Sequence, residues 1–130
     1  ITLEEVHGVA EAIGYGAIKY YDLRRNPTTN YKFTYDQMLD TKGNTAVYLL
    51  YARVRLESIM TRAKADFSVD VEELWKSGME ISLDHPAERN LALALQQFSD
   101  IMDLTLEDLF PYHICEYVYN VANAAADFIT

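Results

Sequence analysis

The chain of 130 residues and 14.9 kDa is long enough for one domain and leaves little room for a second. Half of its residues are hydrophobic, which argues against a disordered chain, and no stretch approaches the roughly 20 apolar residues of a membrane span. The 11 basic and 20 acidic side chains give a net charge of −9, which by itself argues against a general nucleic-acid binder.

The first part of the chain carries a helix signal followed by a loop signal. Thr2 and Glu5 have the spacing of a capping box, and apolar side chains then recur at helical intervals to about Leu23. Pro27 breaks this pattern, so residues 24–31 are predicted to form a loop. Residues 32–40 are ambiguous, because their apolar positions fit either a short strand or one helical turn.

Further helices are predicted in the rest of the chain from N-cap residue types, strong helix formers and apolar side chains at helical spacing. Proline also contributes, since Pro86 suits a first helical position and Pro111 separates the last two helices. The sequence therefore predicts an all-α fold, a bundle of four or five helices whose apolar stripes face inward. The predicted helices after Leu23 cover about residues 46–63, 70–75, 86–109 and 114–129.

Charge is distributed unevenly along the chain. Residues 1–64 contain nine basic and seven acidic side chains, whereas residues 65–130 contain two basic and thirteen acidic ones. Seven of the ten tyrosines also lie in the first half. We therefore expect any anionic partner to bind the first half of the chain.

Cys115 is the only cysteine, so the chain can form no internal disulfide. A lone cysteine is typical of a reducing compartment, and no targeting peptide is visible before the first helix. We therefore expect a cytoplasmic protein. The chain opens at Ile1 and not at a methionine, which suggests a fragment or a processed chain.

Residue groups that would catalyse a reaction or bind a metal are few. Glu4-x-x-His7 and the reversed pair His113-x-x-Glu116 provide only one of the two ordered pairs that a carboxylate di-metal bundle needs. Cys115 lies two residues from His113, so on a helix the two side chains point in different directions. The adjacent acids at 72–73 and 107–108 diverge in the same way and give no support to acid–base catalysis. We therefore predict no catalytic residue and no metal site in this chain.

One helical face combines tyrosine with arginine. Tyr48, Tyr51, Arg55 and Arg62 are separated by steps of three, four and seven residues, which place them on one side of the helix predicted over 46–63. Aromatic rings and guanidinium planes stack on unpaired RNA bases, and arginine also pairs with phosphate. The alternative is that these tyrosines belong to the core, although a core face rarely carries two arginines. Residue types alone leave both interpretations open.

Three runs of the chain resemble the arginyl-tRNA synthetase family. They are residues 12–23 (AIGYGAIKYYDL), 30–39 (NYKFTYDQML) and 43–55 (GNTAVYLLYARVR). Residues 83–88, Phe98 and residues 111–128 fit the same family more loosely. The resemblance implies that residues 1–40 are the tail of a catalytic module and its junction. It also implies that residues 41–130 are the helical anticodon-binding (DALR) domain without its final helix.

The resemblance implies a partner and a parent reaction as well. The family joins arginine to its tRNA with ATP and Mg²⁺, and its H-I-G-H-like and K-M-S-K-S-like nucleotide-binding signatures are absent from this sequence. We therefore expect the chain to be inactive alone and to hold no cofactor, with ATP and Mg²⁺ bound elsewhere in the parent enzyme. The expected partner is the anticodon loop of tRNA for arginine. The family's Tyr-x-x-Tyr-Ala-x-x-Arg pattern, which faces that loop, falls here on Tyr48, Tyr51, Ala52 and Arg55.

A protein–protein interaction module is the alternative function for the same face. Aromatic residues and arginine also dominate the energetics of protein interfaces. Added salt should weaken RNA binding steeply and an apolar protein interface only slightly, so salt dependence separates the two functions. We expect neither DNA nor a membrane as a partner.

Overall fold

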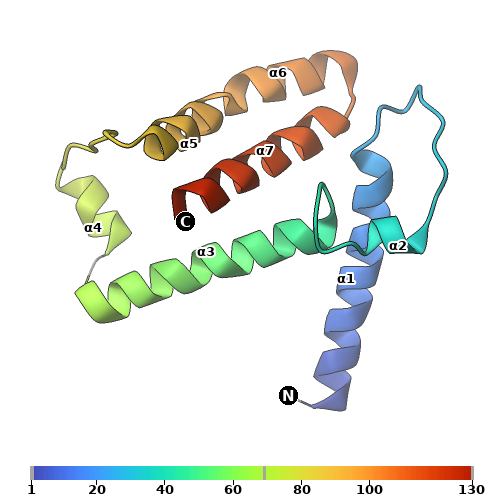
Figure 1. Ribbon diagram of the computed structural model, residues 1–130, viewed down its shortest axis with the longest axis horizontal. Coiled ribbons are helices and arrows are strands. Elements are labelled where there is room, and N and C mark those ends of the chain that lie inside the picture. The colour runs from blue at the N-terminus through green and yellow to red at the C-terminus, as the bar shows by residue number, and fades with distance from the viewer. Residues whose placement is uncertain (1, 69, 130) are drawn as a thin grey trace.

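Seven helices joined by turns and short loops make up residues 2–68 and 70–129, the part of the chain that the structure, a computed structural model, describes (Figure 1). These residues contain no strand, so the predicted all-α class is confirmed. There are more helices than predicted, because the ambiguous segment 32–40 contains a four-residue helix and the helix predicted over 86–109 is divided. The helices are α1 (Leu3–Leu23), α2 (Tyr35–Met38), α3 (Ala46–Phe67), α4 (Val71–Lys76), α5 (Pro86–Gln96), α6 (Phe98–Asp108) and α7 (Tyr112–Ile129).

Side-chain caps begin four of these helices. Thr2 and Glu5 form the predicted capping box at α1, with the Glu5 N–H donating to Thr2 at 3.2 Å and the Thr2 N–H donating to Glu5 at 2.7 Å. Thr45 and Asp70 accept hydrogen bonds from first-turn amides of α3 and α4. His85 does the same at α5 through its ring Nδ1. Local hydrogen bonds therefore explain where these helices begin.

The helix predicted over residues 86–109 is divided at Gln97 into α5 and α6. The backbone N–H of Gln97 bonds to the carbonyl of Ala94 at 3.3 Å, three residues back and not four. This tighter turn interrupts the regular helical hydrogen-bond pattern, and α5 and α6 together curve along α7 (Figure 1). The prediction of one continuous helix is therefore wrong. The sequence does not reveal the break, because no proline or glycine lies at it.

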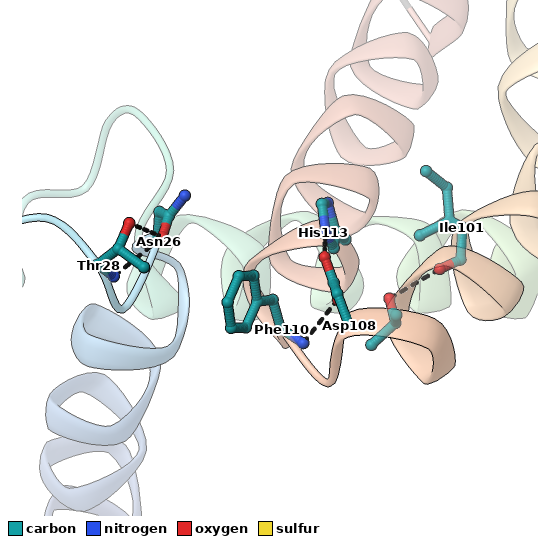
Figure 2. Close-up of polar contacts among 7 residues, drawn as sticks. Asn26, Thr28, Ile101, Asp108, Phe110 and His113 are labelled. Carbon is teal, nitrogen blue, oxygen red and sulfur yellow. Dashed lines mark hydrogen bonds and ion pairs between the residues drawn. The ribbon is translucent and has the colours of Figure 1, made fainter.

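The carboxylate of Asp108 fixes the turn from α6 to α7 (Figure 2). One oxygen accepts the backbone N–H of Phe110 at 2.9 Å, and the other lies 2.7 Å from His113 Nε2. Leu109 adopts a left-handed backbone conformation between them, with φ of 60°. Burial acts to raise the pKa of Asp108, but the hydrogen bonds from His113 and Phe110 outweigh burial and hold that pKa below its ordinary value. His113 therefore has a structural partner in this turn.

Helices α3 and α7 run side by side, and the other helices are arranged around this pair (Figure 1). Helices α5 and α6 pack along the side of α7 that faces away from α3. Helix α1 crosses the end of the pair at which α3 begins, and α4 lies near the opposite end of α3. Helix α3 is thus covered on one side only, and none of its residues is buried.

A polar junction joins α1 to the starts of α3 and α7. The Tyr20 hydroxyl lies 2.5 Å from Asn44 Oδ1 and 3.0 Å from the carbonyl oxygen of Cys115. Directly after the last residue of α1, the Arg24 guanidinium donates to the carbonyl oxygen of Asn44. Burial raises the pKa of Tyr20, and Arg24 opposes this only in part, so the hydroxyl keeps its proton and remains a donor. Polar contacts between distant parts of the chain therefore determine how α1 meets the α3–α7 pair.

The enclosed core is small. Tyr21 and Ala17 of α1 are each 1% exposed and pack with the buried Met38 of α2. The accessible surface of 10162 Å² exceeds the roughly 7,000 Å² expected for a compact monomer of this mass. Every helix carries large apolar side chains that remain exposed, such as Trp75 of α4 at 81%. The apolar stripes that the sequence predicted to face inward are therefore only partly enclosed.

Replacing Tyr20 by phenylalanine tests the polar junction. Tyr20→Phe keeps the ring but leaves Asn44 and the Cys115 carbonyl without this donor, so the free energy of unfolding should fall by about 1–3 kcal/mol. Chemical denaturation followed by circular dichroism measures the change. Tyr15→Phe is the matched control, because Tyr15 lies on the same helix, is 57% exposed and has a hydroxyl that makes no hydrogen bond to another described residue. Equal stability of the two variants would contradict the role of the junction.

The lowered pKa of Asp108 predicts a loss of stability in acid. As the pH falls, the unfolded chain takes up this proton before the folded chain does, so the stabilisation by the carboxylate is complete at neutral pH and is lost below about pH 4. Asp108→Asn should therefore flatten the acid side of the curve of unfolding free energy against pH. Asp100→Asn, at an exposed position of the same helix, should leave the curve unchanged. A curve for Asp108→Asn as steep as that of the unsubstituted chain would refute this prediction.

Candidate nucleic-acid interface

A groove open to solvent lies between α3 and α7. The α3 wall contains three of the four residues predicted as the Tyr/Arg face, which are Tyr48, Tyr51 and Arg55. The structure therefore brings these three side chains to one site and adds a second wall from a helix far away in the sequence. The remaining lining residues are Ala52, Leu56, Ala122, Ala125, Ala126 and Ile129.

Tyr48 connects the two walls of the groove. Its hydroxyl donates to Asn123 Oδ1 on α7 at 2.8 Å. Its ring meets the ring of Tyr119 edge to face, with centroids 5.7 Å apart. Because Tyr48 is partly buried and paired in this way, it holds α3 against α7 as well as lining the groove.

Tyr51 and Arg55 lie on the open side of the α3 wall. Tyr51 is 65% exposed, and Arg55 is also exposed one turn further along the helix. Neither side chain makes a hydrogen bond or ion pair with any other residue that the structure describes. A free aromatic ring beside a free guanidinium supplies one surface for stacking and several N–H donors for a phosphate or a base edge.

Arg62 lies outside the groove. It is two turns beyond Arg55 on α3 and lines a separate hollow with Ile59, Asp66 and Phe67. The helical spacing predicts that Arg62 lies on the same face of the helix as Arg55, and in the structure it does. Arg62 is nevertheless not part of the groove, because α7 does not reach this far along α3.

The α7 wall was not among the predicted site residues. Its alanines at 122, 125 and 126 are small, so their side chains leave space between the two helices. The run of alanines at 124–126 was the signal for this wall in the sequence. A second groove shares Ala52, Leu56, Ala122 and Ala125 with the first and continues toward Met60 on α3 and Val118 on α7.

Charge differs between the helices on either side of α7. Helix α3 carries four basic and two acidic side chains. Helix α6 carries four acidic side chains and no basic one. Since α6 lies on the side of α7 away from α3, the four carboxylates of α6 are kept apart from the groove (Figure 1). The site is therefore suited to an anion in spite of the net charge of −9.

The described residues offer little to other kinds of ligand. Within residues 2–68 and 70–129, no group of three or more His, Cys, Asp or Glu side chains is placed to hold a metal ion. In the same residues, no helix combines the length and apolar character that crossing a membrane requires. The groove with Tyr51 and Arg55 is thus the candidate site with the clearest chemistry.

Comparison with known sequences defines the class of this protein. Residues 49–130 match the sequence family described as the DALR anticodon binding domain. The match covers more than half of the chain, so the chain belongs to this family of anticodon-binding domains. The relatives that it resembles over nearly its whole length are arginine–tRNA ligases, and the resemblance noted in the three sequence runs is confirmed.

Three relatives show the extent of this similarity. The chain is 48% identical over 121 residues to the chloroplastic/mitochondrial arginine–tRNA ligase of Arabidopsis thaliana, which covers 93% of this chain and 18% of that protein. It is 41% identical over 130 residues to the cytoplasmic arginine–tRNA ligase of Homo sapiens, covering 98% of this chain and 19% of that protein. Its fold matches the crystal structure of arginyl-tRNA synthetase from Plasmodium falciparum with a TM-score of 0.82 and 34% identity, over 93% of this chain and 21% of that chain. The chain therefore spans about a fifth of the length of these relatives.

The two tyrosines of the groove should differ in their contribution to stability. Tyr48→Phe removes the hydroxyl that pairs with Asn123, so the free energy of unfolding should fall by about 1 kcal/mol. Tyr51→Phe removes an exposed hydroxyl and should change it by less than about 0.5 kcal/mol. Urea denaturation of both variants measures the difference, and a larger loss for Tyr51→Phe would contradict the geometry of the groove.

Proposed function

We propose that this chain is the anticodon-binding portion of an arginine–tRNA ligase and that the groove between α3 and α7 receives the anticodon loop of tRNA for arginine. One observation carries the proposal: Tyr51 and Arg55 lie exposed beside the groove without polar partners among the described residues, in a member of an anticodon-binding family. These side chains contribute little to the fold, and their chemistry matches that of unpaired RNA bases and phosphates.

Each residue of the predicted Tyr/Arg face has its own role in this proposal. Tyr51 stacks on an unpaired base of the anticodon loop, an interaction worth about 1–3 kcal/mol per base. Arg55 contacts a base edge or a phosphate. Tyr48, fixed by Asn123, forms a rigid wedge at the groove. Arg62 meets the RNA backbone further along α3.

The parent reaction, in which arginine is joined to its tRNA, takes place outside this chain in the proposal. Residues 1–40 form the tail of the catalytic module and its junction, and residues 41–130 belong to the anticodon-binding domain. The exposed apolar stripe of Leu3, Val6 and Val9 on α1 supports this division, because it offers a surface on which the remainder of the ligase can pack. The family's nucleotide-binding signatures do not occur in this sequence, so in this proposal ATP and Mg²⁺ bind the remainder of the ligase and this chain alone is inactive.

The proposed compartment of the ligase is the cytoplasm. Cys115 is buried and unpaired, as is typical of proteins in a reducing compartment. Cytoplasmic arginine–tRNA ligases are among the relatives, and that of Arabidopsis thaliana is 46% identical to this chain. Immunofluorescence of the full ligase in its own cells tests this assignment, and a signal confined to organelles would overturn it.

The alternative function, a protein–protein interaction module, is favoured by the second groove. That groove is lined mainly by apolar side chains, from Leu49 to Met60 on α3 and at Val118 and Val121 on α7. An apolar surface of this kind is suited to a helix or loop of another protein. Binding of such a partner would change little with added salt, whereas tRNA binding would weaken steeply.

Substitutions at Tyr51 and Arg55 in the intact ligase test the proposed tRNA face. Tyr51→Ala should weaken tRNA binding by roughly tenfold through the loss of one stacked base, while the affinities for ATP and arginine hold. Arg55→Gln should weaken tRNA binding and reduce the slope of log affinity against log salt concentration by about 0.7–0.9, the value of one phosphate contact. Fluorescence anisotropy of labelled tRNA at several salt concentrations measures both quantities.

Val54→Ala and Arg53→Gln are the matched controls for these two substitutions. Val54 is 63% exposed on α3 and lines neither groove, and Arg53 is an exposed arginine that lines the second groove. Both control variants should bind tRNA like the unsubstituted ligase. Unchanged tRNA affinity in the Tyr51 and Arg55 variants would refute the proposed function.

A further inference from the structure

Arg25, just after the end of α1, is held between two tyrosine rings. Its guanidinium carbon lies 4.5 Å from the ring centroid of Tyr21 and 4.2 Å from that of Tyr31. The two rings themselves meet edge to face, with centroids 5.6 Å apart. Cation–π contacts with two rings at these distances fix the position of the guanidinium group.

Both tyrosine rings are themselves held by neighbouring residues. Tyr21 is 1% exposed, and its hydroxyl donates to Gln37 Oε1 at 3.0 Å. Tyr31 donates its hydroxyl hydrogen to the carboxylate of Asp22. The rings cannot turn away from Arg25 without breaking these bonds, so Arg25 is positioned before any ligand arrives.

The loop after Arg25 is also built on specific hydrogen bonds (Figure 2). The side-chain oxygen of Asn26 accepts the backbone N–H of Thr28 at 3.0 Å and the Thr28 hydroxyl at 2.7 Å. The hydroxyl of Thr29 donates to the Asn26 carbonyl at 2.8 Å. These bonds define the course of the chain immediately after Arg25.

Arg25 differs from its neighbour Arg24 in whether its guanidinium N–H groups are hydrogen-bonded within the protein. Arg24 also contacts the Tyr21 ring, but its guanidinium donates to the carbonyl oxygen of Asn44. The Nε of both arginines is buried without a partner, but Arg25, unlike Arg24, makes no side-chain hydrogen bond or ion pair with any residue in 2–68 or 70–129. A positioned guanidinium with unused N–H donors is suited to an oxyanion that approaches its open edge.

The charge around Arg25 favours a phosphate. Residues 23–35 contain three basic side chains, Arg24, Arg25 and Lys32, and no acidic one. The nearby Asp22 already accepts the Tyr31 hydroxyl. We propose that Arg25 binds a phosphate group of the tRNA backbone, at a site separate from the groove between α3 and α7. This inference rests on the proposed tRNA-binding function and adds a second point of contact to it.

The position of Arg25 allows one RNA to reach both sites. The loop that carries it lies at the end of the molecule where α3 begins (Figure 1). Arg24 ties this loop to Asn44, two residues before α3, so the loop and the Tyr48–Arg55 face belong to one connected part of the structure. The exposed rings of Tyr31 and Phe33, each 40% exposed, flank the site and add surfaces on which a sugar or a base can pack.

The test uses the intact ligase and its tRNA. Arg25→Gln should weaken tRNA binding by roughly tenfold, as expected for the loss of a charge-assisted hydrogen bond, and should reduce the salt slope by about 0.7–0.9. Because a phosphate contact carries no sequence information, a tRNA with an altered anticodon should lose affinity by the same factor. Arg25→Lys should keep the salt slope and recover part of the affinity, since lysine retains the charge but not the planar fork of donors. Arg53→Gln is again the matched control.

Two results would overturn this inference. The first is an unchanged tRNA affinity and salt slope for Arg25→Gln. The second is a lower melting temperature of the Arg25→Gln ligase without tRNA together with an unchanged salt slope, which would assign Arg25 to a carboxylate elsewhere in the protein. If Tyr51→Ala weakens binding and Arg25→Gln does not, the phosphate site alone is refuted. If only Arg25→Gln weakens binding and lowers the slope, the phosphate site stands and the groove loses its proposed role.

Discussion

Tyr20 occupies the point at which α1, the loop before α3 and the first turn of α7 meet. Helix α3 spans 22 residues without a buried one, so burial of apolar surface alone does not determine where it lies. The polar contacts of Tyr20 and Arg24 with Asn44, and the bond from Tyr48 to Asn123, hold it in place. Paired polar groups require a defined geometry, so they select one arrangement where apolar packing would permit several. The positions of the groove and of the loop after α1 both depend on the helix arrangement that these polar contacts fix.

The features that could be predicted from the sequence are those with local causes. The starts of α1, α3 and α4 follow from side chains such as Thr2, Thr45 and Asp70, which bond to amides two or three residues away. The tyrosine and arginine side of α3 follows in the same way from helical periodicity. These predictions required no knowledge of how the helices pack.

The features that escaped prediction depend on contacts between distant residues. The second wall of the groove comes from α7, and Tyr48 and Asn123 are 75 positions apart. Arg62 shares a face with Arg55 but not a site, because only the packing of α7 decides where the groove ends. The residue types around Gln97 do not indicate that the helix is divided there. The apolar stripes remain exposed because several helices pack against neighbours on one side only.

The placement of acidic α6 across α7 from the more basic α3 gives the molecule an electric dipole moment. A polyanion that approaches at random exerts a torque on such a molecule and turns the α3 side toward itself before any atoms touch. This effect lies in the rate of association more than in the strength of the complex, and it fades as salt screens the field. If tRNA binds as proposed, the carboxylates of α6 affect its binding without contacting it, because they make wrongly oriented encounters rare.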